Sequence, residues 1–224
     1  MSKRADAVIV AAGSGTRSGL NIPKQFYIID EKPVLAHTVN VFLALDEIDT
    51  VVVVLPEDDF LSHKAFMENY LCNSRVIYVS GGSTRLLSVF NGLLALEKKG
   101  ACNIVCIHDG VRPFVTGKII LDSVACAEKN VAALTAVPIT DTVKQVNNSI
   151  VEKTLDRSVL FAAQTPQTFN FEKIISAYRK SIADGMSFTD DCAVAEYCGI
   201  KITITPGSTK NVKLTVLEDF EDLQ

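Results

Sequence analysis

The residues best suited to chemistry first appear in a glycine-rich loop that follows an unbroken apolar run, residues 7–12. The glycines and cations of this loop are Gly13, Gly15, Arg17, Gly19 and Lys24. Glycine lets a backbone approach a ligand closely, so that consecutive N–H groups can point at one anion. No acidic residue lies between Ala7 and Asp30 to repel such an anion. Together these features predict a polyphosphate site.

Two familiar phosphate-binding loops do not fit this sequence. A P-loop requires Gly-Lys-Ser/Thr at a fixed spacing after its first glycine, which residues 13–19 do not supply. In a dinucleotide fingerprint the third glycine would come one residue earlier, and Pro23 would not follow so soon. Glycines alone could also mark an ordinary turn after a strand. Arg17 and the segment Pro23-Lys24-Gln25 favour the phosphate site over that turn.

A second candidate centre is Asp109, which follows the expected strand 103–107 in the segment His108-Asp109-Gly-Val-Arg112-Pro113. In an open α/β sheet, ligands collect at the carboxyl ends of the strands. Mg²⁺ needs only one or two carboxylates besides phosphate oxygens, so Asp109 can be its protein ligand. We expect Asp109 at a solvent-facing strand tip. Arg112 suits a phosphate, because guanidinium grips phosphate bidentately, but it could instead be a structural partner of Asp109.

The elements that must position these groups alternate along the chain. Apolar strands are expected at 7–12, 51–55, 75–80, 103–107 and 131–137, with helical patterns between them. This alternation predicts one α/β domain over residues 1–224, with a mostly parallel sheet and helices on both faces. The turn Gly81-Gly82 would then lie beside the first loop, where Gly82 and Ser88 can contact a base or ribose.

Two later segments depart from this regular alternation. Residues 139–146 and 150–157 read as a β-hairpin, which is only marginally stable alone and needs a surface to pack on. That surface could belong to its own domain or to a partner. Farther along, Asp190 and Asp191 invite an acid/base interpretation, but they precede a helical pattern, and N-capping explains them more simply.

Composition excludes several classes of protein. The 224 residues carry a formal net charge of −4, which argues against a nucleic-acid partner or an anionic membrane surface. No apolar run approaches the roughly 20 residues of a membrane-spanning helix. No signal-type cleavage region follows the N-terminus, and the six cysteines show neither a C-x-x-C pair nor a disulfide framework. We therefore expect a cytoplasmic enzyme with reduced thiols.

The motifs themselves resemble a known family. Ala11-Ala12-Gly-Ser-Gly-Thr-Arg17, Pro23-Lys24-Gln25, His-Asp-x-x-Arg-Pro at 108–113 and Thr165-Pro-Gln are similar to the signatures of sugar- and polyol-phosphate cytidylyltransferases. The resemblance runs through nearly the whole chain. It implies a Rossmann-like, GT-A-like nucleotidyltransferase that uses CTP and Mg²⁺. It also implies that the hairpin at about 139–157 is an arm that crosses to a second subunit of a homodimer.

The resemblance assigns expected roles to individual residues. For catalysis it implies Arg17, Lys24, Asp109 and Lys213, with Asp109 also the metal ligand. For the nucleotide it implies Ala11, Ala12, Gly13, Gly15, Gly82 and Ser88. For the acceptor phosphate it implies Arg112, Thr142, Arg157 and Thr165.

Three functions are compatible with these motifs. The favoured one is transfer of CMP from CTP to 2-C-methyl-D-erythritol 4-phosphate, a step of non-mevalonate isoprenoid biosynthesis. Ribitol 5-phosphate is the alternative acceptor, although Ala11-Ala12-Gly and Thr154-Leu-Asp-Arg157 favour the first. A catalytically silent nucleotide-binding subunit is the third. Retention of Arg17, Lys24, Asp109 and Lys213 together argues against it.

Overall fold

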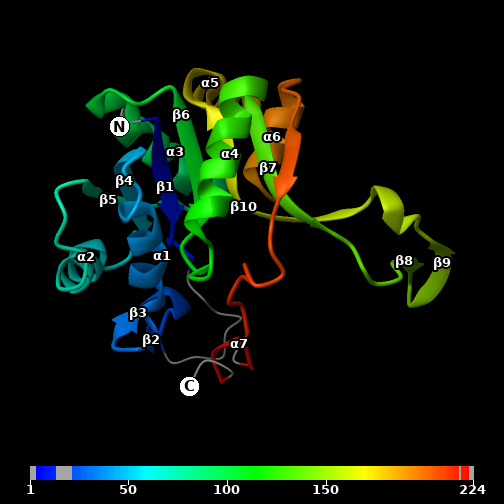
Figure 1. Ribbon diagram of the computed structural model, residues 1–224, viewed down its shortest axis with the longest axis horizontal. Helices are drawn as coiled ribbons and strands as arrows, with labels where there is room; N and C mark the ends of the chain where they lie inside the picture. The colour runs from blue at the N-terminus through cyan, green and yellow to red at the C-terminus, as the bar shows by residue number, and fades with distance from the viewer. Residues whose placement is uncertain (1–3, 14–21, 217, 222–224) are drawn as a thin grey trace.

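The main body is built on one twisted sheet (Figure 1). The computed structural model describes residues 4–13, 22–216 and 218–221. Over these residues the main sheet has seven strands in the order β11-β7-β10-β6-β1-β4-β5. Their bounds are β1 Ala5–Val10, β4 Ile48–Leu55, β5 Val76–Ser80, β6 Ile104–Asp109, β7 Ala132–Pro138, β10 Phe161–Asn170 and β11 Thr203–Pro206. Only β10 runs antiparallel to its neighbours, so the mostly parallel sheet expected from the sequence is confirmed.

Helices cover both faces of this sheet. The helices on one face are α1 (Val34–Leu43), α2 (Phe60–Glu68) and α4 (Gly117–Asn130). Those on the other are α3 (Arg85–Lys99), α5 (Phe171–Ala183) and α6 (Asp191–Tyr197). Strand β1 shows why its sequence is apolar throughout: Ala7 and Ile9 pack into the first layer and Val8 into the second, all fully buried. Among the described residues, no helix is both long and apolar enough to cross a bilayer.

Short elements complete the fold near the site. A 3-10 helix, Lys24–Phe26, is followed by β2 (Ile28–Ile29), which pairs with β3 (Lys32–Pro33). The short helix α7 spans Glu218–Glu221. Phe220 is buried against Val34 of α1, Val111 and Leu214, which ties the C-terminal segment to the edge of the sheet that carries the site.

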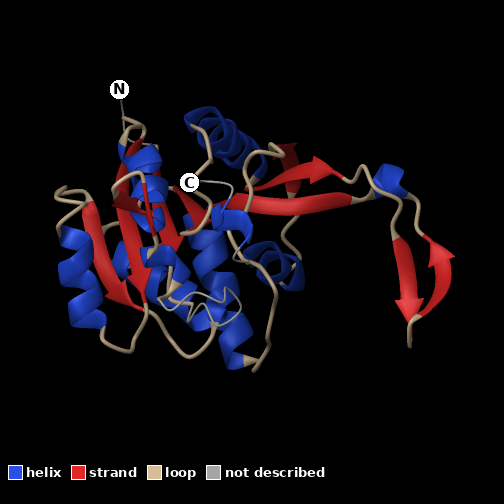
Figure 2. Cartoon of the chain, turned by 90° about the horizontal axis from the view of Figure 1, so that it is seen from below, coloured by secondary structure: helices blue, strands red, loops and turns tan. Residues whose placement is uncertain are grey.

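The hairpin is present and stands away from the body (Figures 1 and 2). Its strands are β8 (Lys144–Asn147) and β9 (Ile150–Thr154), which are shorter than the expected 139–146 and 150–157. Arg157, the last residue expected in the second strand, belongs to a 3-10 helix. Every residue of β8 and β9 is exposed, including the apolar Val146, Ile150 and Val151. Within one chain the hairpin therefore does not pack on its own domain, which was one of the two expectations.

Candidate active site

A pocket of about 490 Å³ lies where β1, β5 and β6 end. The described residues that line it are Val10, Ala11, Ala12, Gly13, Lys24, Gln25, Gly82, Ser83, Thr84, Arg85, Ser88, Asp109, Val111 and Lys213. They come from five separate stretches of the sequence, which the fold brings to one edge of the sheet. Eight of the residues nominated from the sequence are in this set: Ala11, Ala12, Gly13, Lys24, Gly82, Ser88, Asp109 and Lys213.

The floor of the pocket is made by two turns in direct contact. A Cβ added to Gly81 would lie 2.5 Å from the Cβ of Ala12, so only glycine allows the β5–α3 turn to approach the loop after β1 this closely. Ser88 then holds that turn, since its Oγ accepts the N–H of Gly82 at 3.1 Å and lies 2.9 Å from the carbonyl oxygen of Thr84. The expected juxtaposition of the two glycine turns is confirmed.

Lys24 is placed by its neighbour. Nε2 of Gln25 donates to the carbonyl oxygens of Ala11 and Gly13, each at 2.9 Å, and the side chain is buried. Next to it, Phe26 stacks on His63 with ring centroids 4.6 Å apart. The 3-10 helix that carries Lys24 is thus fastened both to the first loop and to α2. In the sequence, Gln25 stands out only as part of the motif Pro23-Lys24-Gln25.

Asp109 is the only carboxylate among the described residues that line the pocket. Its Oδ2 lies 3.1 Å from Nε of Arg112 and 3.1 Å from Nζ of Lys213, and its Oδ1 lies 4.0 Å from Nη2 of Arg85. Burial would raise the pKa of Asp109, but the charges of Lys213, Arg85 and Arg112 outweigh it and hold that pKa well below its ordinary value. The carboxylate is therefore ionised. It is also 7% exposed, which corrects the expectation of a solvent-facing strand tip.

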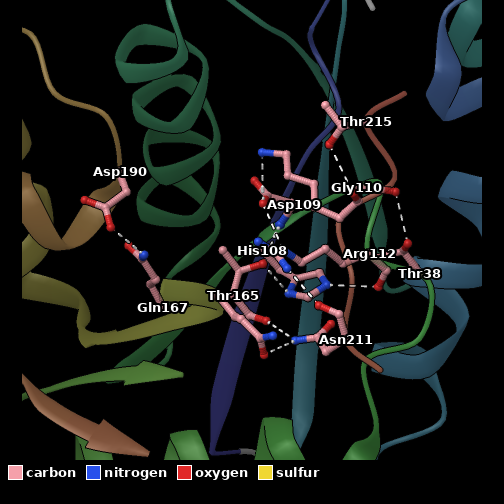
Figure 3. A network of polar contacts seen from close by, with 12 residues as sticks. Thr38, His108, Asp109, Gly110, Arg112, Thr165, Gln167, Asp190, Asn211 and Thr215 are labelled. Atoms are coloured by element: carbon pink, nitrogen blue, oxygen red, sulfur yellow. Dashed lines mark hydrogen bonds and ion pairs between the residues drawn. The ribbon is translucent and has the colours of Figure 1, made fainter. Parts of the chain in front are cut away.

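A polar network lies directly behind Asp109 (Figure 3). Oγ1 of Thr165 accepts the N–H of Asp109 at 3.1 Å and lies 2.9 Å from Nδ1 of His108. The other ring nitrogen of His108 faces the carbonyl oxygen of Arg112 at 3.4 Å. A carbonyl can only accept, so Nε2 carries the proton and Nδ1 accepts from Thr165. Burial lowers the pKa of His108 to about 4, which keeps the ring neutral.

The C-terminal segment closes this network. Nη1 of Arg112 donates to the carbonyl oxygen of Asn211 at 2.8 Å, and Nδ2 of Asn211 donates to the carbonyl oxygen of Thr165 at 2.9 Å. The side chain of Asn211 is fully buried. Lys213 comes two residues later, so these bonds fix the segment that brings it to Asp109. Arg112 is 9% exposed and meets Asp109, as the alternative interpretation of the sequence had it.

Of the remaining nominated residues, those that the structure describes are not among the residues that line the pocket within one chain. Thr142 and Arg157 are exposed on the arm, and Nη1 of Arg157 donates to the carbonyl oxygen of Thr140. Gly15 and Arg17 lie outside the described residues. Thr165 and Arg112 form the wall behind Asp109, with their polar groups engaged as above.

Arg85 was not among the residues nominated from the sequence, and Asp191 has another role than the one expected. Arg85 lines the pocket, and both its Nη atoms donate to Asp191 at 2.7 Å. Asp190 does cap α6, since its Oδ1 accepts the N–H of Ala193 at 2.9 Å. The capping interpretation is therefore confirmed for Asp190 but wrong for Asp191, which is a fully buried ion-pair partner.

A second acidic group lies at the opposite end of β1. Ligand atoms of Asp6, Asp49 and Cys102 lie within 4.8 Å of one another. Both oxygens of Asp6 are already occupied, by the N–H groups of Thr50 at 3.0 Å and Cys102 at 2.7 Å. Burial also raises the pKa of the Cys102 thiol to about 11, and a protonated thiol is a poor ligand for a hard cation. This group joins the starts of β4 and β6 and does not fit Mg²⁺.

A mostly parallel α/β sheet with a cation-lined pocket at its carboxyl edge places the protein among the Rossmann-like nucleotidyltransferases. Comparison with known proteins narrows the class. The model of the 2-C-methyl-D-erythritol 4-phosphate cytidylyltransferase family matches residues 5–223, and the chain belongs to this family. Enzymes of this family are in general dependent on a divalent cation.

Individual relatives agree with the family match. The chain is 42% identical to 2-C-methyl-D-erythritol 4-phosphate cytidylyltransferase of Clostridioides difficile (strain 630), over 95% of this chain and 89% of that protein. The crystal structure of 4-diphosphocytidyl-2C-methyl-D-erythritol synthase from Anaerococcus prevotii DSM 20548 matches with a TM-score of 0.84 and 33% identity, covering 99% and 94% of the two chains. For the Francisella tularensis cytidylyltransferase the TM-score is 0.81 at 30% identity, with 97% of each chain covered.

Proposed function

We propose that this chain transfers CMP from CTP to 2-C-methyl-D-erythritol 4-phosphate, releasing pyrophosphate. The observation that carries the proposal is a family match over residues 5–223 in a chain whose described pocket is lined by Lys24, Arg85 and Lys213 around one carboxylate. The product is 4-diphosphocytidyl-2-C-methyl-D-erythritol, an intermediate of isoprenoid biosynthesis. The cytoplasmic location expected from composition is part of the same proposal.

The chemistry needs charge neutralisation more than proton transfer. An acceptor phosphate oxygen attacks the α-phosphorus of CTP, the bond from that phosphorus to the bridging oxygen breaks, and pyrophosphate carries the electron pair away. The nucleophile is already an anion, so no Ser, Cys or His is required to activate it. Lys24 and Lys213, with Arg17, supply the positive charge that lets one anion approach another. We assign the phosphates to the backbone N–H groups of Ala12, Gly13 and Gly15, because the N–H of Ala11 already donates to the carbonyl oxygen of Val54 at 2.9 Å. Gly82 and Ser88 are assigned to the nucleoside.

Asp109 fits a divalent cation. It is ionised, faces the pocket, and has Lys213 and Arg112 on Oδ2, while the nearest cation to Oδ1 among the described residues is Arg85 at 4.0 Å. Mg²⁺ is satisfied by one carboxylate with phosphate oxygens and water, so Asp109 would hold it together with the CTP phosphates. When bound, the metal would neutralise charge on those phosphates. Arg112 then serves the site by holding the Asp109 carboxylate. Thr165, which was also nominated for the acceptor phosphate, lies next to Asp109, because its Oγ1 accepts the Asp109 N–H.

The proposed activity is tested by incubating the protein with CTP, Mg²⁺ and one polyol phosphate at a time while measuring pyrophosphate release. We expect kcat/KM for 2-C-methyl-D-erythritol 4-phosphate to exceed that for ribitol 5-phosphate by at least about 10²-fold, the discrimination a site built for one hydroxyl pattern can reach. Equal or reversed values would identify a ribitol-phosphate enzyme. CTP binding without turnover of either acceptor would identify a silent subunit.

We also propose that the arm serves a second copy of the chain. Val146, Ile150 and Val151 are 53%, 71% and 56% exposed on a ribbon too small to stand alone. Both views show the ribbon projecting from the body (Figures 1 and 2). Arg157 lies at its base and is not among the described residues of its own pocket. In a symmetric homodimer, each arm would carry Thr142 and Arg157 to the acceptor phosphate of the other subunit.

Mixing two inactive variants tests whether Arg157 acts across the dimer. Arg157→Ala lacks the acceptor clamp and Lys24→Ala lacks the charge stabiliser. A mixed dimer would hold one intact site and one doubly altered site. Random exchange makes about half of the dimers mixed, so activity should recover to roughly a quarter of wild type for independent sites. Exchange seen by native mass spectrometry without recovered activity would show that Arg157 serves its own subunit.

A further inference from the structure

Arg85 occupies an unusual position for a cation in a phosphate pocket. It is the first residue of α3, follows the N-cap Thr84 and lines the pocket together with Lys24, Asp109 and Lys213. Yet both of its Nη atoms point to a carboxylate on another element, Asp191 of α6, at 2.7 Å each. A guanidinium held bidentately in this way has most of its charge and geometry committed to that carboxylate. Arg85 is thus poorly suited to be a primary phosphate ligand.

The carboxylate that holds Arg85 is itself held from behind. Asp191 is fully buried, and its Oδ1 also accepts from the hydroxyl of Tyr178 in α5 at 2.5 Å. Burial, and then the charge of Asp191, raise the pKa of Tyr178, so this hydroxyl keeps its proton and donates. Gln167 of β10 accepts the backbone N–H of Asp191 at 3.0 Å and donates to Asp190 at 2.8 Å. A buried carboxylate with this many partners has one available orientation.

The series of contacts from Tyr178 through Asp191 to Arg85 ends near Asp109. Nη2 of Arg85 lies 4.0 Å from Oδ1 of Asp109, whereas Arg112 and Lys213 each lie 3.1 Å from Oδ2. The charge of Arg85 therefore faces Oδ1 at the outer limit of an ion pair, while Oδ2 is held by the two other cations. Lys213 has 41% of its side chain exposed, whereas the Arg85 side chain is 29% exposed and anchored by a buried partner. Arg85 is the better fixed of these two groups.

We propose that Arg85 is a positioning residue for the transfer reaction: held by Asp191 and Tyr178, it fixes the orientation of the Asp109 carboxylate. This inference rests on the proposed role of Asp109 in that reaction. It links the α5–α6 layer on one face of the sheet to the pocket at its edge. It also explains why a buried charged group, Asp191, occurs at the start of a short helix that Asp190 already caps.

The test uses the substitution Arg85→Lys, which keeps the charge but loses the bidentate geometry. We expect kcat to fall by about 10- to 100-fold, the scale of a small misplacement of a reacting group, with the CTP Kd from calorimetry changed by less than about threefold. Tyr178→Phe removes only the hydroxyl that holds Asp191 and should also lower kcat, by a smaller factor.

The matched control is Arg179→Lys, because Arg179 of α5 makes a surface ion pair with Glu97 of α3 at 2.7 Å. It alters an ion pair between α5 and α3 away from the pocket, and its kcat should equal that of wild type.

A double-mutant cycle separates the inference from the proposed function. If Arg85 acts through Asp109, Arg85→Lys should lower the residual kcat of the Asp109→Asn enzyme by less than about twofold. A full additional loss in that background would overturn the positioning role. If Asp109→Asn alone left kcat intact, the proposed role of Asp109 would fail instead. Loss of thermal stability in Arg85→Lys with unchanged kcat of the folded enzyme would show a merely structural contact.

Discussion

Replacing Lys24 with alanine is expected to lower kcat by about 10²- to 10³-fold, the effect of removing one preorganised donor from a developing charge. Lys24 lies in the pocket on a 3-10 helix that Gln25 fastens to the first loop, so its backbone position should survive the substitution. Negative charge grows on the leaving pyrophosphate only as the bond to the α-phosphorus breaks. A cation aimed there contributes more to the transition state than to bound CTP.

Steady-state kinetics together with calorimetric CTP binding measure this difference. The CTP Kd should rise much less than kcat falls. Lys32→Ala is the control, since Lys32 is exposed on β3 and loses the same charge outside the pocket. Its kinetic constants should match those of wild type. A loss confined to KM in Lys24→Ala would show that Lys24 binds CTP equally in the ground and transition states.

Replacing Asp109 with asparagine should reduce both turnover and stability. Turnover should fall by about 10³-fold or more, because a carboxylate that holds the metal on the phosphates accounts for several kcal/mol of transition-state stabilisation. The loss of stability is expected because Asp109 is 7% exposed and lies between Arg112, Lys213 and Arg85. Removing one partner of a buried ion pair typically costs about 3–5 kcal/mol. Here we expect about 2–4 kcal/mol, because Lys213 is partly exposed and asparagine still accepts a hydrogen bond.

Scanning calorimetry in the absence of nucleotide measures the loss of stability as a change in Tm. A loss of this size should lower Tm by roughly 5–12 °C in a domain of this length. Asp122→Asn provides the control, because Asp122 pairs with Lys118 on the exposed face of α4 and surface pairs contribute about 0–1 kcal/mol. An unchanged Tm in Asp109→Asn with lost turnover would mean that the three cations are held in place by other contacts. A lowered Tm with full turnover would contradict the metal-ligand role.

Local sequence patterns predict the buried strands and locate the two principal motifs, the glycine-rich loop after residue 12 and the segment 108–113. Unbroken apolar runs at Ala7–Ala12 and Val51–Leu55 predict strands buried on both faces, and β1 and β4 are buried almost throughout. Glycines beside an apolar strand predict a backbone that another segment approaches closely, as Gly81 and Ala12 do. These inferences succeed because strand periodicity and glycine conformation depend on a residue and its near neighbours.

Strand order could not be obtained in this way. The last long strand, β10, returns after the arm and enters the sheet between β6 and β7, antiparallel to both. Its sequence, Phe161–Asn170, is compatible with an edge as well as with an interior position. Pairing between segments distant in the chain depends on the whole set of competing strands, which no local pattern records.

The partners of the charged residues were decided only by the tertiary structure. The sequence indicates that Asp109 and Lys213 belong to a site, but Arg85 and Asp191 are 106 residues apart, and Arg112 and the carbonyl of Asn211 are 99 apart. Whether an arginine binds a ligand or a buried carboxylate depends on distances of a few ångströms that the fold sets. Burial then decides the consequence, because a charge removed from water must be paired. The sequence alone thus identifies Lys24, Asp109 and Lys213 as charged residues of the candidate site. The fold adds Arg85 to the pocket and decides which charged residues hold others in place.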